Sequence, residues 1–149
     1  MIIHKRLLLI LSFLIVTTLN FSCKKQEDLP SEKIKAKKMV LVYMEANNDL
    51  RYEALTSINR MEKGAKDIDG VLLVYIKTSS VQSYLLKIKY DPDENRIVSD
   101  TVKTYTNSPN TDPEFMKDVV NDGQKEYPAE TYGLILWSHA TSWHLLQMR

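Results

Sequence analysis

The segment YGLILWSHATSW, residues 132–143, constrains the fold of this chain more than any other. Residues 133–137 are apolar or glycine and carry no charge, which is typical of a strand buried on both faces of a parallel sheet. Small polar residues and His139 follow where that strand should end. In open α/β sheets ligands bind outside the carboxyl ends of the strands. His139 is therefore a candidate general acid/base, because the unperturbed pKa of histidine lies near neutral pH.

Two further runs, residues 39–44 (MVLVYM) and 71–76 (VLLVYI), are apolar and rich in residues that favour strands. Both predict buried central strands. Residues 83–90 and 96–105 instead alternate polar and apolar side chains, and the turn-forming segment 91–95 separates them. This pattern predicts a hairpin with one face toward water.

Two helices are predicted between these strands. Residues 50–61 repeat apolar side chains at helical spacing. Either Asn47 or Asn48 can accept the free N–H groups at the start of this helix, and Asp49 suits the positive end of its dipole. Residues 111–114 (TDPE) form a capping box with proline in the first turn of the second helix. Strand–helix–strand order predicts a right-handed crossover, so we expect an α/β fold with at least three parallel strands.

The amino terminus has the pattern of a bacterial signal peptide. A basic start precedes a mostly apolar segment, residues 7–19, which at ~1.5 Å per residue reaches about 20 Å, short of the ~30 Å bilayer core. Small Ser22 directly before Cys23 resembles a lipoprotein processing site. We expect cleavage before Cys23 and lipidation of its thiol, with plain secretion or an uncleaved anchor as the alternatives. Either way, Cys23 is a poor candidate for catalysis.

Composition limits the number of domains and the class of partner. We assign residues 1–22 to a lipoprotein signal peptide, residues 23–37, which are lysine-rich and polar, to a flexible tether, and residues 38–149 to one domain. The formal net charge of the chain is only +1, which argues against a nucleic-acid partner. The four glycines form no phosphate-binding loop.

Three segments resemble clostripain-type cysteine peptidases. Residues 40–61 (VLVYMEANNDLRYEALTSINRM) resemble the opening strand, Asn-Asp-Leu loop and first helix of that family, and residues 71–78 (VLLVYIKT) are similar to its second strand. Residues 112–143 (DPEFMKDVVNDGQKEYPAETYGLILWSHATSW) resemble the stretch that leads to its catalytic histidine. The resemblance spans most of residues 38–143 in the family's order and spacing. It implies a caspase-like sandwich with a mostly parallel central sheet, truncated here after the histidine-bearing strand.

The resemblance also assigns site residues. It places His139 on the family's catalytic histidine, the general acid/base. The family usually has glycine at the next position, where this chain has Ala140, whose backbone N–H is expected to help bind the oxyanion. The family's nucleophile lies in an Asp-Ala-Cys segment on the next strand, and this chain ends at Arg149 before such a segment. The acidic residues that hold a basic substrate side chain lie in that part too, so no nucleophile is assigned here.

Other catalytic chemistries find little support in the residues. Peptide cleavage by cysteine needs a thiolate beside an imidazole, so we expect this chain to be inactive alone. Neither Ser138 nor Ser142 lies in a Gly-x-Ser-x-Gly elbow. A zinc site from His139 and His144 would need further ligands, so no metal site is predicted. The Asp-x-Asp-x-Asn spacing of residues 91–95 lacks the glycine and glutamate of an EF-hand, and the calcium dependence of the full-length family stays open.

Two hypotheses from different classes remain. The first is a membrane-anchored cysteine endopeptidase of clostripain type, cleaving peptide or protein substrates after basic residues once it is completed. The second is a non-enzymatic surface lipoprotein that retains the caspase-like fold for binding. Both imply an exported protein held by lipid in the cell envelope. The DNA beyond the codon for Arg149 separates them, because an Asp-Ala-Cys-like segment there would support the peptidase.

Overall fold

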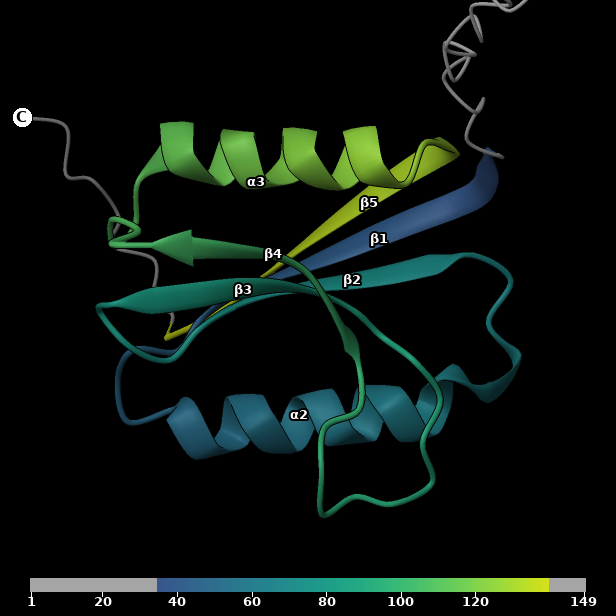
Figure 1. Cartoon of the computed structure of the whole chain (residues 1–149), viewed down its shortest axis with the longest axis horizontal. Coiled ribbons are helices and arrows are strands. Elements are labelled where there is room, and N and C mark those ends of the chain that lie inside the picture. The colour runs from purple at the N-terminus through teal and green to yellow at the C-terminus, as the bar shows by residue number, and fades with distance from the viewer. Residues whose placement is uncertain (1–34, 140–149) are drawn as a thin grey trace, which may run out of the picture. The chain divides into compact units, whose positions relative to one another are not determined.

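A computed structural model describes residues 35–139 of the chain, and residues 1–34 and 140–149 lie outside this description. The described residues form a five-stranded sheet in the order β4-β3-β2-β1-β5, with helix α2 on one face and helix α3 on the other (Figure 1). In chain order the elements are β1 (Ala36–Glu45), α2 (Arg51–Gly64), the 3₁₀ turn η1 (Ala65–Asp67), β2 (Val71–Lys77), β3 (Gln82–Lys87), β4 (Asp100–Thr106), α3 (Pro113–Glu126) and β5 (Ala129–Trp137).

The pairing of the strands confirms the α/β prediction and refines it. Strand β1 pairs in parallel with both β2 and β5, so that Leu41 lies opposite Leu73 on one side and Leu134 on the other. The β3 strand is antiparallel to β2 and to β4, as the predicted hairpin requires. The sheet is therefore mixed, with three parallel strands at one side and two antiparallel strands at the other.

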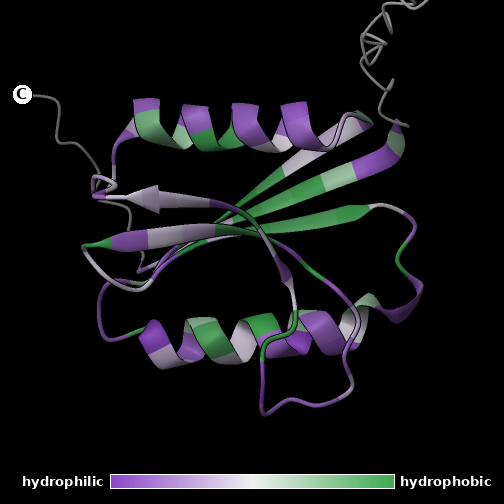
Figure 2. Ribbon diagram, in the orientation of Figure 1, coloured by the Kyte–Doolittle hydropathy of each residue, from purple (hydrophilic) through white to green (hydrophobic). Residues whose placement is uncertain are grey.

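Strand β1 separates two apolar cores, because successive side chains of a strand point to opposite faces. Met39, Leu41 and Tyr43 belong to the core beneath α3, and Val42 and Met44 belong to the core beneath α2. All five side chains are buried. This burial on both faces explains why the run is almost continuously apolar, and it confirms the prediction of a central strand (Figure 2).

Strand β5 differs from the expectation of burial on both faces. Leu134, Ile135 and Leu136 remain 47%, 51% and 65% exposed, whereas Leu41 beside them is 1% exposed. The reason is that β5 is an edge strand, which pairs with β1 on one side and with no other strand of the described residues. The apolar pattern correctly predicted a strand, but burial depends on neighbours.

The helix starts also differ in detail from the predicted caps. Asp112, rather than Thr111, caps α3, since its Oδ1 accepts hydrogen bonds from the backbone N–H groups of Glu114 and Phe115 at 2.9 and 3.4 Å. Thr111 has φ 50°, so it belongs to the turn before the cap. Pro113 occupies the first turn as predicted.

At α2 the N-cap position is Leu50, which provides no side-chain cap. The Asn48 side chain instead accepts a hydrogen bond at 2.9 Å from the Leu50 N–H, closing a turn before the helix. The prediction that an asparagine caps this helix was therefore wrong, because Asn48 lies two residues before the N-cap position and bonds to the N–H of the N-cap residue itself.

The connection between β3 and β4 is longer than the predicted turn and is tied to α2. The buried Glu62 side chain accepts hydrogen bonds from the backbone N–H groups of Val98 and Ser99 at 2.9 and 2.7 Å. Asp91 is buried and pairs with Arg96 at 3.0 Å. The acidic residues of segment 91–95 thus form local hydrogen bonds and ion pairs. Among residues 35–139, no helix is long and apolar enough to cross a membrane.

Candidate active site

His139 lies two residues beyond Trp137, the carboxyl end of β5, close to where the sequence predicted it. The neighbouring Ser138 hydroxyl donates a 2.8 Å hydrogen bond to the backbone carbonyl of Glu45, the last residue of β1. Because β1 and β5 are parallel and paired, both strands end at the same edge of the sheet. The histidine therefore stands at the edge where α/β folds gather their chemistry.

The structure brings Asp49 to His139. The Oδ1 atom of Asp49 lies 2.6 Å from Nε2 of His139, although the two residues are 90 positions apart in the sequence. The hydrogen bond from His139 is the main reason that the pKa of the Asp49 carboxyl is lowered from its ordinary value of 3.8. Asp49 is therefore ionised at neutral pH and can only accept a hydrogen bond, so Nε2 carries the proton.

Sequence reasoning missed this contact. The sequence assigned Asp49 to the positive end of the dipole of the next helix, and this role can be inferred from neighbouring residues alone. The signal that could have found it is the strand order, because a loop after β1 and a residue after β5 meet only if those strands are neighbours. The apolar patterns predict each strand but not its neighbour.

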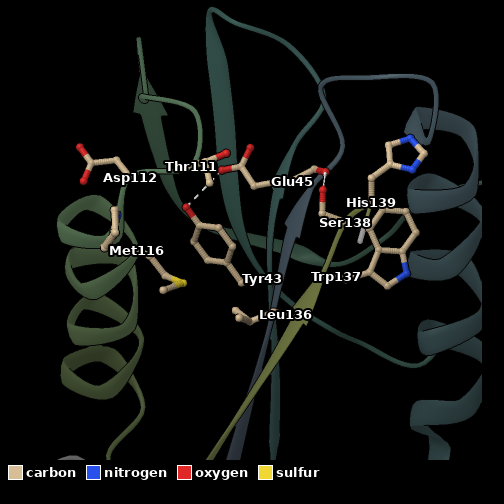
Figure 3. A pocket seen from close by; sticks show the side chains of 10 residues that line it. Tyr43, Glu45, Thr111, Asp112, Met116, Leu136, Trp137, Ser138 and His139 are labelled. Atoms are coloured by element: carbon tan, nitrogen blue, oxygen red, sulfur yellow. Dashed lines mark hydrogen bonds between the residues drawn. The ribbon is translucent and has the colours of Figure 1, made fainter. Parts of the chain in front are cut away.

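A cavity of about 310 Å³ opens beside His139 at this edge (Figure 3). Tyr43 and Met116 line the side toward α3, whereas Trp137 and His139 lie toward α2 (Figure 3). The remaining lining residues are Glu45, Thr111, Asp112, Pro113, Leu136 and Ser138. An apolar wall with a few polar groups beside a titratable histidine is the usual composition of a small-molecule or side-chain pocket.

The carboxyl group of Glu45, which lines this cavity, interacts with Tyr43 and Lys77. Burial raises the pKa of the Glu45 carboxyl, while Lys77 and a 3.3 Å hydrogen bond from the Tyr43 hydroxyl oppose the shift. Lys77 is fully buried and its Nζ donates a 2.5 Å hydrogen bond to the Ser108 carbonyl. The end of β2 thus holds the segment that leads into α3, part of which lines the cavity.

The described residues supply a proton-transfer group and a pocket but no thiol. The one cysteine of the sequence is Cys23, which lies outside the described residues together with Ala140, Ser142 and His144. The Ser138 hydroxyl is occupied by the Glu45 carbonyl. Within residues 35–139, no group of three or more His, Cys, Asp or Glu side chains is arranged to hold a metal ion.

Comparison with known proteins now identifies the family. A match to the description "Clostripain family" covers residues 42–147, more than half of the chain. The chain belongs to the clostripain family. A search of curated proteins finds no significant match.

Three solved structures illustrate the relationship. A cysteine protease of B. fragilis is 31% identical, with 76% of this chain and 97% of that chain covered and a TM-score of 0.62. A secreted C11 cysteine protease of Bacteroides thetaiotaomicron, solved with an irreversible peptide inhibitor, is 30% identical at TM-score 0.62, with 72% of this chain and 31% of that chain covered. An inactive zymogen C11 protease of Parabacteroides distasonis is 29% identical at TM-score 0.62, with 73% and 32% covered.

These clostripain-family structures confirm the caspase-like fold of the described residues. They also define how much of a relative this chain represents. It spans nearly the whole B. fragilis chain but only about a third of the B. thetaiotaomicron and P. distasonis chains.

Proposed function

We propose that this chain is the histidine-bearing part of a clostripain-type cysteine endopeptidase that cleaves after basic residues. The observation that carries the proposal is the placement of His139 at the open end of β5, beside a cavity and in contact with Asp49, in a chain of this family. In the proposal His139 is the general acid/base. The relative solved with an irreversible peptide inhibitor supports a peptide or protein substrate.

The nucleophile would come from polypeptide that pairs with the free side of β5. Leu134, Ile135 and Leu136 are 47%, 51% and 65% exposed, which suits a strand that is covered by a further strand and its flanking elements. About two-thirds of each longer relative lies outside the part that this chain matches, which is enough polypeptide for such elements. We propose that this added strand carries the cysteine, and that the acidic residues which hold the basic substrate side chain lie in the same part.

The reaction then follows the chemistry of an imidazole beside a thiol. His139 takes the thiol proton, and the thiolate attacks the scissile carbonyl carbon. In this proposal the backbone N–H of Ala140 helps stabilise the resulting oxyanion. The imidazolium gives its proton to the leaving amine as the C–N bond breaks, leaving an acyl-enzyme. A water molecule, deprotonated by the same imidazole, hydrolyses the thioester and returns the thiol.

The test of this function is to measure cleavage of arginyl and lysyl peptide reporters with and without the polypeptide encoded downstream of Arg149. We expect no turnover by the 149-residue chain, because loss of a covalent nucleophile removes several orders of magnitude of rate. Adding the downstream polypeptide should restore turnover.

The control variants make this test specific. The restored activity should disappear in His139→Ala and persist in the matched variant His144→Ala. Turnover by the isolated chain that His139→Ala abolishes would contradict the proposal, and so would restored activity that tolerates His139→Ala. If the downstream DNA encodes no cysteine-bearing segment, the surface-lipoprotein hypothesis is favoured instead.

We further propose that the protein is exported and anchored by lipid at Cys23, after removal of residues 1–22. In this proposal the tether ends before β1 begins at Ala36, two residues earlier than the predicted end at residue 37. A relative described as secreted supports export. Cells fed a palmitate analogue should label the protein, and Cys23→Ala should abolish the label while Ser22→Ala, which keeps a small residue, should retain it. Equal labelling of the Cys23→Ala variant would disprove the anchor.

A further inference from the structure

The loop that carries Asp49 is fixed by contacts that do not involve its side chain. Fully buried Ala46 donates its N–H to the Lys77 carbonyl at 2.9 Å, which holds the loop against the end of β2. The Asn48 side chain accepts from the Leu50 N–H at 2.9 Å, and its carbonyl accepts from the Arg51 N–H at 3.3 Å. The loop is therefore shaped by β2 and by the turn into α2, which leaves the Asp49 carboxylate to project from a set backbone.

The carboxylate is also not used by the helix that follows. No side chain caps α2, whose N-cap residue is Leu50. Asp49 contacts His139 instead, through Oδ1 and Nε2 at 2.6 Å. A short acidic side chain one residue before a helix cap has an ordinary local use, and here it is directed across the sheet edge to the histidine.

We propose that Asp49 is the positioning residue of His139, holding the imidazole through Nε2–H so that Nδ1 faces the nucleophile. This inference rests on the proposed peptidase function. An ionised carboxylate has no proton to donate, so the neutral imidazole must keep its proton on Nε2 and present the Nδ1 lone pair. Nδ1 is then the atom that takes the thiol proton and later returns it to the leaving amine.

The position of the His139 side chain thus depends on two neighbouring strands, β5 and β1. Strand β5 delivers His139, and the Ser138 hydroxyl fixes the adjacent backbone to the Glu45 carbonyl. Strand β1 delivers Asp49, which restrains the rotation of the ring. The same logic, a carboxylate that orients the base and selects its tautomer, operates in triads on unrelated folds.

The exposure of the pair makes this role separable from folding. The side chains of His139 and Asp49 are 53% and 82% exposed. Exposed ion pairs contribute little to stability, so an Asp49 variant should fold normally. A loss of function in that variant would then report orientation of the ring rather than unfolding.

The first experiment needs no activity. The full chain contains three histidines, so ¹⁵N labelling of the imidazoles gives a small set of ring signals, and His139→Gln assigns those of His139. In the wild type we expect the neutral His139 ring to be protonated at Nε2 only, and Asp49→Ala should introduce the Nδ1–H tautomer. The Asp49 carboxyl should also titrate at higher pH in His139→Gln. A carboxyl titration that is identical with and without His139 would overturn the proposal.

The second experiment uses the enzyme completed by the downstream polypeptide. We expect Asp49→Ala to lower kcat about 10- to 100-fold, by analogy with the loss seen when partners that orient metal-binding histidines are removed. KM should stay within about twofold, because substrate contacts are unchanged. Asp49→Asn, which retains an acceptor oxygen, should recover part of the loss.

Glu53→Gln is the matched control, since it removes a carboxylate one turn further along α2 and should keep wild-type kcat. A kcat for Asp49→Ala equal to that of Glu53→Gln would overturn the positioning role. If the completed wild-type enzyme shows no cysteine-dependent cleavage, the proposed function fails, and the ring signals still decide whether Asp49 sets the tautomer of His139.

Discussion

The two edges of the sheet have opposite chemistry. Strand β4 at one edge is built mainly of threonine and charged residues (DTVKTYT), and most of its side chains are exposed. Its Lys103 forms a 2.7 Å ion pair with Asp122 of α3, and its pairing with β3 is interrupted by a register shift. Strand β5 at the other edge exposes Leu134, Ile135 and Leu136 to solvent.

The difference shows which edge is adapted to water. Charged residues and irregular pairing are the means by which natural sheets prevent further strands from adding, and β4 has both. Strand β5 has neither over its apolar segment, and it also delivers His139 to the candidate site. The comparison therefore supports the proposal that β5 is an interior strand of the completed peptidase, while β4 is its outer edge.

Truncating the same residue type in a central and an edge strand gives the largest expected effect. Leu41 of β1 and Leu134 of β5 lie opposite each other, with 1% and 47% exposure. Leu41→Ala should lower the free energy of unfolding by about 2–5 kcal/mol, because it leaves a cavity in the core. Leu134→Ala should cost about 1 kcal/mol or less. Urea unfolding measures both, and equal losses would show that β5 is already buried in solution.

Placing a charge on each edge tests self-association. We expect soluble residues 33–149 to associate and to bind hydrophobic dyes through β5. Ile135→Lys should weaken association at least about tenfold, or about 1.4 kcal/mol, whereas the matched change Thr104→Lys on β4 should leave it unchanged. Analytical ultracentrifugation provides the measurement. A monodisperse wild-type monomer with no dye binding would contradict the prediction that the protein self-associates through β5.

The smallest expected effect is the loss of the contact between Asp49 and His139 at acidic pH. The pKa of Asp49 is lowered by its hydrogen bond with His139, so the contact is present above the ordinary value of 3.8 and is lost as pH falls through the lowered value. We expect the amide signal of His139 to shift over that acidic range with little change in global stability, since both side chains are exposed. Asp49→Asn should remove the shift. A shift that persists in Asp49→Asn would assign it to another group.

The sequence predicted the types of the main elements well, because the signals are local. Alternation, apolar runs and helical spacing belong to segments of 6–14 residues, and β1, β2, α2 and α3 formed where those patterns lie. The sequence predicted the helix caps less well, because two neighbouring residues can both act as the N-cap. Thr111 and Asp112 are both able to cap a helix, and the positive φ of Thr111 left the cap to Asp112.

What the sequence determined by itself is that a strand ends just before His139, since an uncharged apolar run followed by small polar residues has few other solutions. Tertiary structure alone decided that this strand lies at an edge, half exposed, beside β1. That placement brings Asp49 within 2.6 Å of His139 across 90 residues. The physical reason is that strand order is chosen by the packing of whole elements, with helices covering both faces of the sheet, and no local pattern in either strand records which neighbour it will have.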